Sequence, residues 1–105
     1  MTVNEMPSDT TVMDALRQVE DPELGMDIVE IGLIYGVSFP QPGTVRVSYS
    51  LTSPACPAGP QITSDIVNTV RALPGVEEVD PELVWSPAWT PDRMSDDAKF
   101  ILGIG

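Results

Sequence analysis

Apolar and polar residues alternate most regularly between residues 33 and 51. Apolar side chains occupy every second position from 33 to 39 and again from 45 to 51. A period of two residues is typical of a β-strand that has one buried face. The intervening residues 40–43, Pro-Gln-Pro-Gly, favour a turn. The sequence therefore predicts a β-hairpin, and its second strand has the cleaner alternation.

A first helix is predicted before the hairpin. Thr11 and Asp14 resemble a capping box, so the helix is expected to begin between Asp9 and Thr11. It must end before Pro22, because the residue ahead of a proline is pushed out of the helical conformation. The apolar face expected to lie on the sheet is formed by Val12, Leu16 and Val19.

A second helix follows the hairpin. Its apolar positions repeat at helical spacing, and the run Leu73-Pro74-Gly75 ends it. Gly59 and Pro60 suit the N-cap and first helical positions, although a start at Pro57 also fits. The residues expected on the buried face are Ile62, Ile66, Val70 and Leu73.

The last third of the chain predicts one strand and one short helix. Residues 76–85 form the strand, and Pro81 indicates a sheet edge or a bulge because proline cannot donate a ladder hydrogen bond. Thr90 or Ser95 is expected to cap the final helix. Its expected buried side chains are those of Ala98, Ile101 and Leu102.

These elements give the order α-β-β-α-β-α. A hairpin followed by a helix and a third strand predicts an α+β fold, a two-layer sandwich whose three-stranded sheet is covered by helices on one face. A chain of 105 residues has room for one domain. We expect a flexible tail over residues 1–8 and a single domain over residues 9–105.

The composition excludes several kinds of site. The chain has one cysteine and no histidine, so an internal disulfide, a Ser-His-Asp triad, a Cys-His pair and the usual zinc sites within one chain are all excluded. The unpaired cysteine and the absence of a leader-like N-terminus predict a cytoplasmic protein. The net charge of −11 repels nucleic acid and anionic lipid, and no apolar run is long enough to span a membrane.

The only cysteine, Cys56, lies in a proline-rich turn just before the second helix. Backbone N–H groups and the helix dipole favour a thiolate there, whereas free cysteine is also common as a small buried hydrophobe. Asp21 and Glu23 flank Pro22 in a second turn. Their pattern fits turn formation by Asp21 and a solvated Glu23, and also fits acid–base chemistry or a hard metal.

Five segments now identify a resemblance. In order they are Asp21-Pro22-Glu23-Leu24, Ile31-Gly32-Leu33-Ile34-Tyr35, Leu51-Thr52-Ser53-Pro54-Ala55-Cys56-Pro57, Pro74-Gly75-Val76 and the run from Trp85 to Ser95. Together they resemble the SufT/PaaD-like metal-sulfur cluster assembly family, also called domain of unknown function fifty-nine. The resemblance covers about residues 10–104. The sequence shows neither the cysteine-rich C-terminal extension of the phenylacetate branch nor a fused P-loop ATPase. Membership of an oxygenase complex is therefore not expected, and any nucleotide-driven step is expected to need a partner.

The resemblance implies a small α/β domain of the iron-sulfur cluster assembly type. It also implies that Asp21, Glu23, Thr52 and Cys56 gather around one surface site, with Cys56 as the metal ligand. Thiolate is the ligand that iron in a cluster prefers, but one chain supplies only one. We therefore expect a labile iron-sulfur cluster or iron, held in a homodimer or a transient complex with assembly proteins or apo client proteins.

Three functions are compared on this basis. The first is an accessory factor that holds or transfers iron or a cluster through Cys56, with Asp21 or Glu23 as an oxygen ligand and Thr52 orienting the loop. The second is a metal-free acidic adaptor that docks client or assembly proteins through Trp85 and Trp89. The third, a thiol enzyme, is the weakest because no base of suitable pKa stands near the cysteine in the sequence. The expectation is therefore a protein that is not an enzyme.

Overall fold

The computed structural model describes residues 7–53 and 57–103 of the chain. Of the tail expected over residues 1–8, only the last two residues are therefore described. Ser8 is the N-cap of the first helix, α1 (Asp9–Leu16), and its side-chain oxygen accepts the N–H of Thr11 at 3.1 Å. The start of this helix is confirmed, but its cap lies one residue before the expected range, because Thr11 donates to the cap and does not form it.

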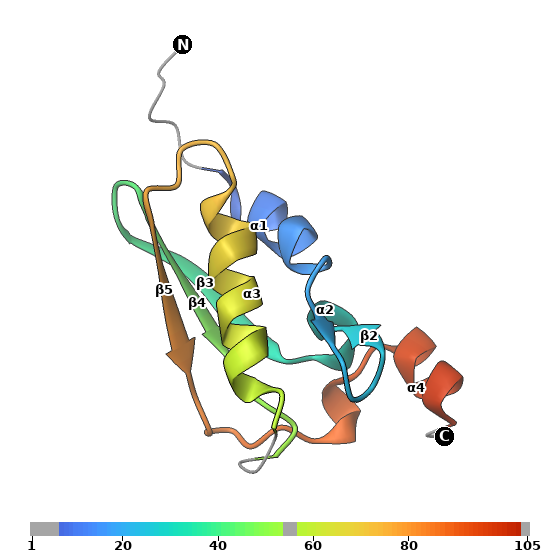
Figure 1. The fold of residues 1–105 in the computed structure, drawn as a ribbon. Coiled ribbons are helices and arrows are strands. Elements are labelled where there is room, and N and C mark those ends of the chain that lie inside the picture. Colours follow the sequence, from blue (N-terminus) through green and yellow to red (C-terminus); the bar gives the residue numbers. More distant parts are fainter. Residues whose placement is uncertain (1–6, 54–56, 104–105) are drawn as a thin grey trace.

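The three predicted strands form one sheet in the order β3-β4-β5 (Figure 1). β3 (Ile34–Gln41) pairs antiparallel with β4 (Thr44–Tyr49), which confirms the hairpin. β5 (Glu78–Leu83) pairs parallel with β4 and lies at the edge of the sheet, as Pro81 indicated. It is two residues shorter at each end than the expected strand.

The two faces of β4 differ in chemistry. Val45, Val47 and Tyr49 are buried beneath the helices. On the opposite face Arg46 pairs with a carboxylate of β5, and Ser48 donates to another, at 2.8 Å, so this face is polar. α1 and the long helix α3 (Gly59–Arg71) lie on one side of the sheet (Figure 1). The predicted α+β sandwich with one covered face is confirmed.

α3 supplies the middle of the hydrophobic core. Three of its predicted buried residues, Ile62, Ile66 and Val70, have no exposed surface. The helix begins at Gly59 with Ala58 as its N-cap, one residue earlier than the favoured expectation. A short hydrogen bond between Tyr49 at the end of β4 and Thr63 in α3 fixes the helix against the sheet.

Residues 20–31 contain three elements that periodicity did not predict. β1 (Glu20–Asp21) and β2 (Met26–Asp27) form a two-stranded antiparallel ribbon, and α2 (Ile28–Ile31) follows directly. Asp27 caps α2 by accepting the N–H groups of Val29 and Glu30 at 3.0 and 2.9 Å. The chain therefore reverses direction between β1 and β2 before the main sheet begins.

The C-terminal part ends in a 3-10 turn, η1 (Pro91–Arg93), and a helix, α4 (Asp96–Leu102). Ser95 caps α4, as one of the two expected residues, by accepting the N–H of Ala98 at 3.0 Å. Ala98 is buried as predicted. Ile101, however, is 69% exposed, so its predicted burial is wrong. α4 contacts α2, away from the main sheet (Figure 1), and this contact buries Ala98 but not Ile101.

No helix within residues 7–53 and 57–103 is long and apolar enough to cross a membrane. The longest of them, α3, has 13 residues, whereas a span needs about 20.

Gly32 is the point where the C-terminal segment closes against the rest of the fold. It ends α2 with a φ of 85°, in the left-handed region. A Cβ atom at this position would lie 2.2 Å from the main-chain oxygen of Arg93. The segment 85–95 can therefore approach α2 only because residue 32 has no side chain.

Replacing Gly32 with alanine should destabilise the protein far more than the same change at Gly25. Both glycines have positive φ, but a Cβ at Gly25 would meet nothing within 4 Å. We expect Gly25→Ala to cost about 1 kcal/mol from backbone strain alone. Gly32→Ala adds overpacking and should cost at least about 3 kcal/mol.

Urea unfolding followed by circular dichroism measures both changes. In thermal unfolding, each kcal/mol lost from the free energy of unfolding should lower the melting temperature of a domain of this size by about 4–8 °C. Equal losses of stability in the two variants would contradict the proposed close contact with Arg93.

Candidate functional site

The loop from residue 52 to residue 58, here called the cysteine loop, joins β4 to α3. Residues 54–56, which include Cys56, lie outside the part of the chain that the structure describes. The role expected for Cys56 therefore stays a prediction. Leu51 and Gly59, the residues that flank the loop, pack closely together. A Cβ atom added to Gly59 would lie only 3.0 Å from Cδ1 of Leu51. The fold thus fixes where this loop starts and ends.

The start of α3 provides the electrostatic setting of the loop. Gly59, its first residue, follows Cys56 by three positions, and Pro60 lies in the first turn. Ala58 at the N-cap position has no side-chain oxygen that could accept from the first N–H groups. The partial positive charge of the helix end therefore stays available to a negatively charged group close to it.

Thr52 lies at the edge of a shallow surface depression of about 290 Å³. The depression is formed by the start of the cysteine loop and by the segment 85–95; its lining residues are Leu51, Thr52, Ser53, Trp85, Ala88 and Trp89. Thr52 is half-buried, and Trp85 is 45% exposed. The described residues around the cysteine loop thus form an aromatic wall beside a hydroxyl group.

Trp89 has a structural role in this wall. Its Nε1–H donates to the main-chain oxygen of Ile31 at 2.9 Å, and its ring packs against the core. Tyr35 fixes the same segment, because its hydroxyl donates to the oxygen of Pro87 at 2.8 Å. The guanidinium of Arg93 stacks on the Tyr35 ring, with its central carbon 3.8 Å from the ring centroid. Trp89 is therefore packed into the fold, whereas Trp85 is 45% exposed.

Asp21 and Glu23 share the turn between β1 and β2 but have different environments. Asp21 is 1% exposed, and its Oδ1 accepts the N–H of Glu23 at 2.9 Å. Its main-chain oxygen also accepts the N–H of Gly25 at 2.8 Å. The Glu23 side chain is exposed. Turn formation by Asp21 and solvation of Glu23 are therefore what the structure shows, and Glu23 is the carboxylate that an external ligand can reach more easily.

A third carboxylate, Glu30, connects three helices. It accepts from Arg17, the C-cap residue of α1, at 2.9 Å and forms a short hydrogen bond with Ser95, the N-cap residue of α4. The hydrogen bond from Ser95, and then that from Arg17, lower the pKa of Glu30 below its ordinary value of 4.5. The same pair raises the pKa of Arg17. Glu30 therefore remains charged and holds α4 in place.

The structure groups the predicted site residues into two sets. Asp21 and Glu23 share the β1–β2 turn, and Thr52 opens the cysteine loop. Figure 1 shows the β1–β2 turn and the start of α3 toward the same end of the molecule, away from the β3–β4 turn. Among residues 7–53 and 57–103, no hydrogen bond joins Thr52 to either carboxylate. The same residues contain no cluster of three histidine, cysteine or acidic side chains that could hold a metal ion. One shared site stays a prediction.

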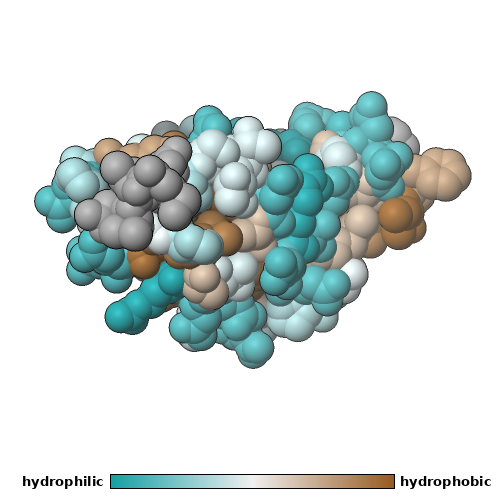
Figure 2. Space-filling model, turned by 90° about the horizontal axis from the view of Figure 1, so that it is seen from above, coloured by the Kyte–Doolittle hydropathy of each residue, from teal (hydrophilic) through white to brown (hydrophobic). Residues whose placement is uncertain are grey.

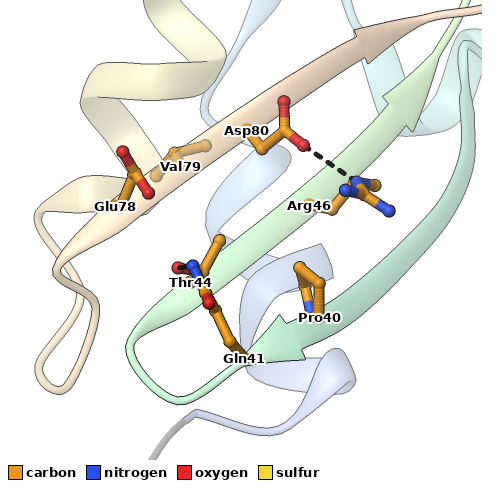
Figure 3. A pocket seen from close by; sticks show the side chains of 7 residues that line it. All are labelled: Pro40, Gln41, Thr44, Arg46, Glu78, Val79 and Asp80. Carbon is orange, nitrogen blue, oxygen red and sulfur yellow. Dashed lines mark hydrogen bonds and ion pairs between the residues drawn. The ribbon is translucent and has the colours of Figure 1, made fainter.

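A second depression lies on the open face of the sheet, with a volume of about 390 Å³. Figure 3 shows Arg46 of β4 reaching across to Asp80 of β5, at 2.9 Å. The hydrogen bond to Asp80 raises the pKa of Arg46. Because the positive charge is already paired with a carboxylate, this depression is a weaker candidate for binding an anion.

Hydrophobic periodicity predicts neither the hydrogen bond that anchors Trp89 nor the helix α2, and only the second has another signal in the sequence. The anchoring of Trp89 on Ile31 joins residues 58 positions apart, so no local pattern reveals it. The helix α2, in contrast, carries a local signal, because Asp27 and Glu30 have the spacing of a capping box.

Comparison with known proteins gives consistent results. Residues 9–80 match the sequence pattern of the family described as "Iron-sulfur cluster assembly protein". The Fe-S protein maturation auxiliary factor YitW of Bacillus subtilis is 44% identical over 93 residues, covering 89% of this chain and 91% of that protein. The Fe-S protein maturation auxiliary factor SufT of Staphylococcus aureus is 44% identical over 86 residues, covering 82% of this chain and 98% of the relative.

The fold is also similar to a solved structure. The crystal structure of a domain of unknown function, DUF59, from Bacillus anthracis superposes with a TM-score of 0.86 at 38% identity. The superposition covers 92% of each chain. The likeness therefore extends over almost the whole domain, including the C-terminal part beyond residue 80.

Two substitutions of Asp21 should separate its hydrogen bond from its charge. Asp21→Asn keeps an oxygen acceptor for the N–H of Glu23, so we expect a loss of stability below about 0.5 kcal/mol. Asp21→Ala leaves that N–H without its acceptor and should cost about 1–2 kcal/mol. Urea unfolding at pH 7 measures both. Equal losses would show that the charge, and not the acceptor, holds the turn.

The stability of the protein should fall in acid partly through Glu30. Its pKa in the folded state lies below that in the unfolded chain. Its contribution is therefore fully present above the unfolded pKa and is lost as the pH falls through the folded pKa. Glu30→Gln should be less stable than the wild type at pH 7, and the difference should shrink as the pH is lowered below 4.5. Urea unfolding from pH 3 to pH 7 tests this, and a difference that is independent of pH would contradict it.

Proposed function

The chain belongs to the iron-sulfur cluster assembly protein family, and we propose that it is an accessory factor that holds iron or an iron-sulfur cluster through Cys56 and passes it to client proteins. The observation that carries the proposal is the match over residues 9–80, which includes the whole cysteine loop. Relatives that align over nearly their full length are named as Fe-S protein maturation auxiliary factors. Those names describe auxiliary factors and not enzymes, and we propose that this chain likewise acts as an auxiliary factor without catalytic activity of its own.

The chemistry of the cargo agrees with the residues of the loop. A cysteine thiolate is the preferred ligand of iron in a cluster, and its formation is favoured near a helix N-terminus. One chain supplies one thiolate, so the remaining ligands must come from a second copy of the chain, a client cysteine or a small thiol. A single protein attachment makes the bound species labile, which suits transfer better than permanent storage.

The four predicted site residues take different roles in this proposal. Cys56 is the sulfur ligand. Glu23, whose carboxylate is exposed, is the oxygen ligand of choice, and Asp21 shapes the turn that presents it. Thr52 orients the start of the loop at the rim of the depression.

Charge supports a cationic cargo. The chain carries sixteen acidic residues against five basic ones. Nearby carboxylates disfavour a free thiolate, while a bound iron ion or a basic partner removes that repulsion. We therefore propose that the ionised form of Cys56 is stabilised mainly when the cargo is bound. The expected partners are assembly proteins and apo client proteins, and the expected compartment is the cytoplasm, where an unpaired thiol stays reduced.

A second candidate function is a metal-free adaptor. The exposed Trp85, beside the depression of the cysteine loop, favours it, because tryptophan is enriched where proteins bind one another. In this version the segment 85–95 docks a client, and Cys56 is not needed. The two candidates therefore differ in which single residue they require.

Anaerobic reconstitution with ferrous iron and sulfide separates the two candidates. We expect visible charge-transfer absorption in the wild type, its loss in Cys56→Ser, and faster loss of the bands to a chelator in Glu23→Gln. Glu77→Gln, an exposed carboxylate at the opposite end of the sheet, is the matched control and should behave as the wild type.

Binding to a cluster-free client protein is then measured with Cys56→Ser and Trp85→Ala. Absence of bands in the wild type, together with binding that depends on Trp85 alone, would replace the carrier by the adaptor. Turnover of a small thioester or disulfide by the wild type would contradict both.

A further inference from the structure

α4 exposes apolar side chains that the rest of the fold does not cover. Ile101 is 69% exposed and Phe100, its neighbour, is 86% exposed. Figure 2 shows hydrophobic residues protruding at the end of the molecule where α4 lies, next to a mainly hydrophilic surface. Exposed large apolar side chains that adjoin one another typically mark a surface for interaction.

The same helix forms one wall of a groove of about 410 Å³. The other wall is the β1–β2 ribbon with the start of α2. We call it the acidic groove, and its lining residues are Glu20, Gly25, Met26, Asp27, Glu30, Asp97, Ala98 and Ile101. The buried Ala98 and the half-buried Met26 give it an apolar floor. It is distinct from the depression of the cysteine loop, with which it shares no lining residue.

The carboxylates of the groove differ in how far they are already compensated. Glu30 pairs with Arg17, and Asp27 accepts two N–H groups of α2. The side-chain carboxylates of Glu20 and Asp97, in contrast, are exposed and make no hydrogen bond or ion pair with the other residues described in the structure. Two carboxylates beside exposed apolar surface can therefore receive cations from outside.

We propose that the acidic groove docks a basic amphipathic segment of a partner protein. Such a segment would place an apolar side chain on Met26, Ala98 and Ile101, and lysine or arginine side chains on Glu20 and Asp97. Laying an amphipathic helix into an apolar groove is a common mode of peptide recognition. This proposal does not depend on Cys56 or on any cluster.

A second copy of the chain fits the groove poorly as the occupant. The protein has five basic residues, and three of them already have partners: Arg17 and Arg46 form ion pairs, and Arg93 stacks on Tyr35. Arg71 and Lys99 lie on different helices. No stretch of the sequence combines clustered basic residues with apolar ones. An anionic membrane is disfavoured in the same way, since the net charge is −11.

The test uses a synthetic amphipathic helical peptide with leucine on one face and lysine on the other, and a second peptide with glutamate in place of lysine. Binding to the full-length protein is followed by two-dimensional NMR. We expect the lysine peptide to shift the signals of the β1–β2 ribbon and α4, and the glutamate peptide to shift none.

Ile101→Ser should weaken binding of the lysine peptide about tenfold, because burying one aliphatic side chain contributes about that much to affinity. The double variant Glu20→Gln/Asp97→Asn should weaken binding and reduce its dependence on salt.

Matched controls lie outside the groove. Phe39→Ser replaces another exposed apolar residue, and Glu77→Gln another exposed carboxylate; neither should change binding by more than about twofold. Because Ile101 is exposed, Ile101→Ser should retain the unfolding midpoint of the wild type. Cys56→Ser should bind the peptide as the wild type does, so failure here and failure of the cluster function are distinguishable.

Four outcomes would overturn the proposal. Equal binding of the two peptides would show that the surface does not select a basic partner. Equal binding by the groove variants and the controls would place the contact elsewhere. Sedimentation that shows a wild-type dimer dissociated by Ile101→Ser, or binding to phosphatidylserine vesicles that this variant abolishes, would assign the surface to a second copy or to a membrane.

Discussion

The close approach of the Arg93 main chain to Gly32 is the constraint on which the C-terminal half of the molecule depends. Residue 32 sits at the end of α2 in a left-handed conformation, and there is no room there for a Cβ atom. Several other contacts follow from this approach: Trp89 reaches the oxygen of Ile31, and Ser95 donates its N–H to the oxygen of Glu30 at 2.9 Å. The aromatic wall of the cysteine loop and the position of α4 therefore both depend on one missing side chain.

The main sheet and its long helix could be predicted because their signals are local and periodic. In β4 the alternation of apolar and polar residues corresponds directly to a buried and a solvated face, and in α3 the spacing of Ile62, Ile66 and Val70 gives the buried stripe. The ribbon β1–β2 could not be predicted in this way. Strands of two residues have no measurable period, and they form only because the turn at Asp21 brings them together.

The error at Ile101 has a different physical origin. The helical pattern of α4 is real, but a pattern shows only that apolar residues share a face, not that another element covers it. The main contact of α4 is with α2, which is a single turn of four residues. So small a partner covers Ala98 and leaves Ile101 exposed. Burial could therefore be predicted where α3 meets a whole sheet and not where α4 meets one helical turn.

The site was predicted mainly from the resemblance, and the structure adds physical roles that the resemblance does not contain. The sequence leaves two interpretations of Asp21 and Glu23 open: a turn formed by Asp21 beside a solvated Glu23, or a pair of carboxylates for acid–base or metal chemistry. The structure supports the first, because the Asp21 carboxylate folds back onto its own turn while Glu23 faces solvent. The same holds for the tryptophans, of which Trp89 is fixed by a hydrogen bond and Trp85 is not buried.

Charge links the two surfaces considered above. Most of the basic residues are used within the molecule: Arg17 and Arg46 in ion pairs and Arg93 on the Tyr35 ring. The acidic excess therefore remains on the surface without internal compensation, and it must be balanced by ions or by partners. Iron at the cysteine loop and lysine or arginine at the acidic groove are both cations, so each would relieve the same repulsion. A cation bound at one surface then reduces the repulsion among the remaining carboxylates, so binding at the two surfaces is electrostatically coupled. This coupling should weaken as salt is added, because salt screens charges separated by more than about 8–10 Å.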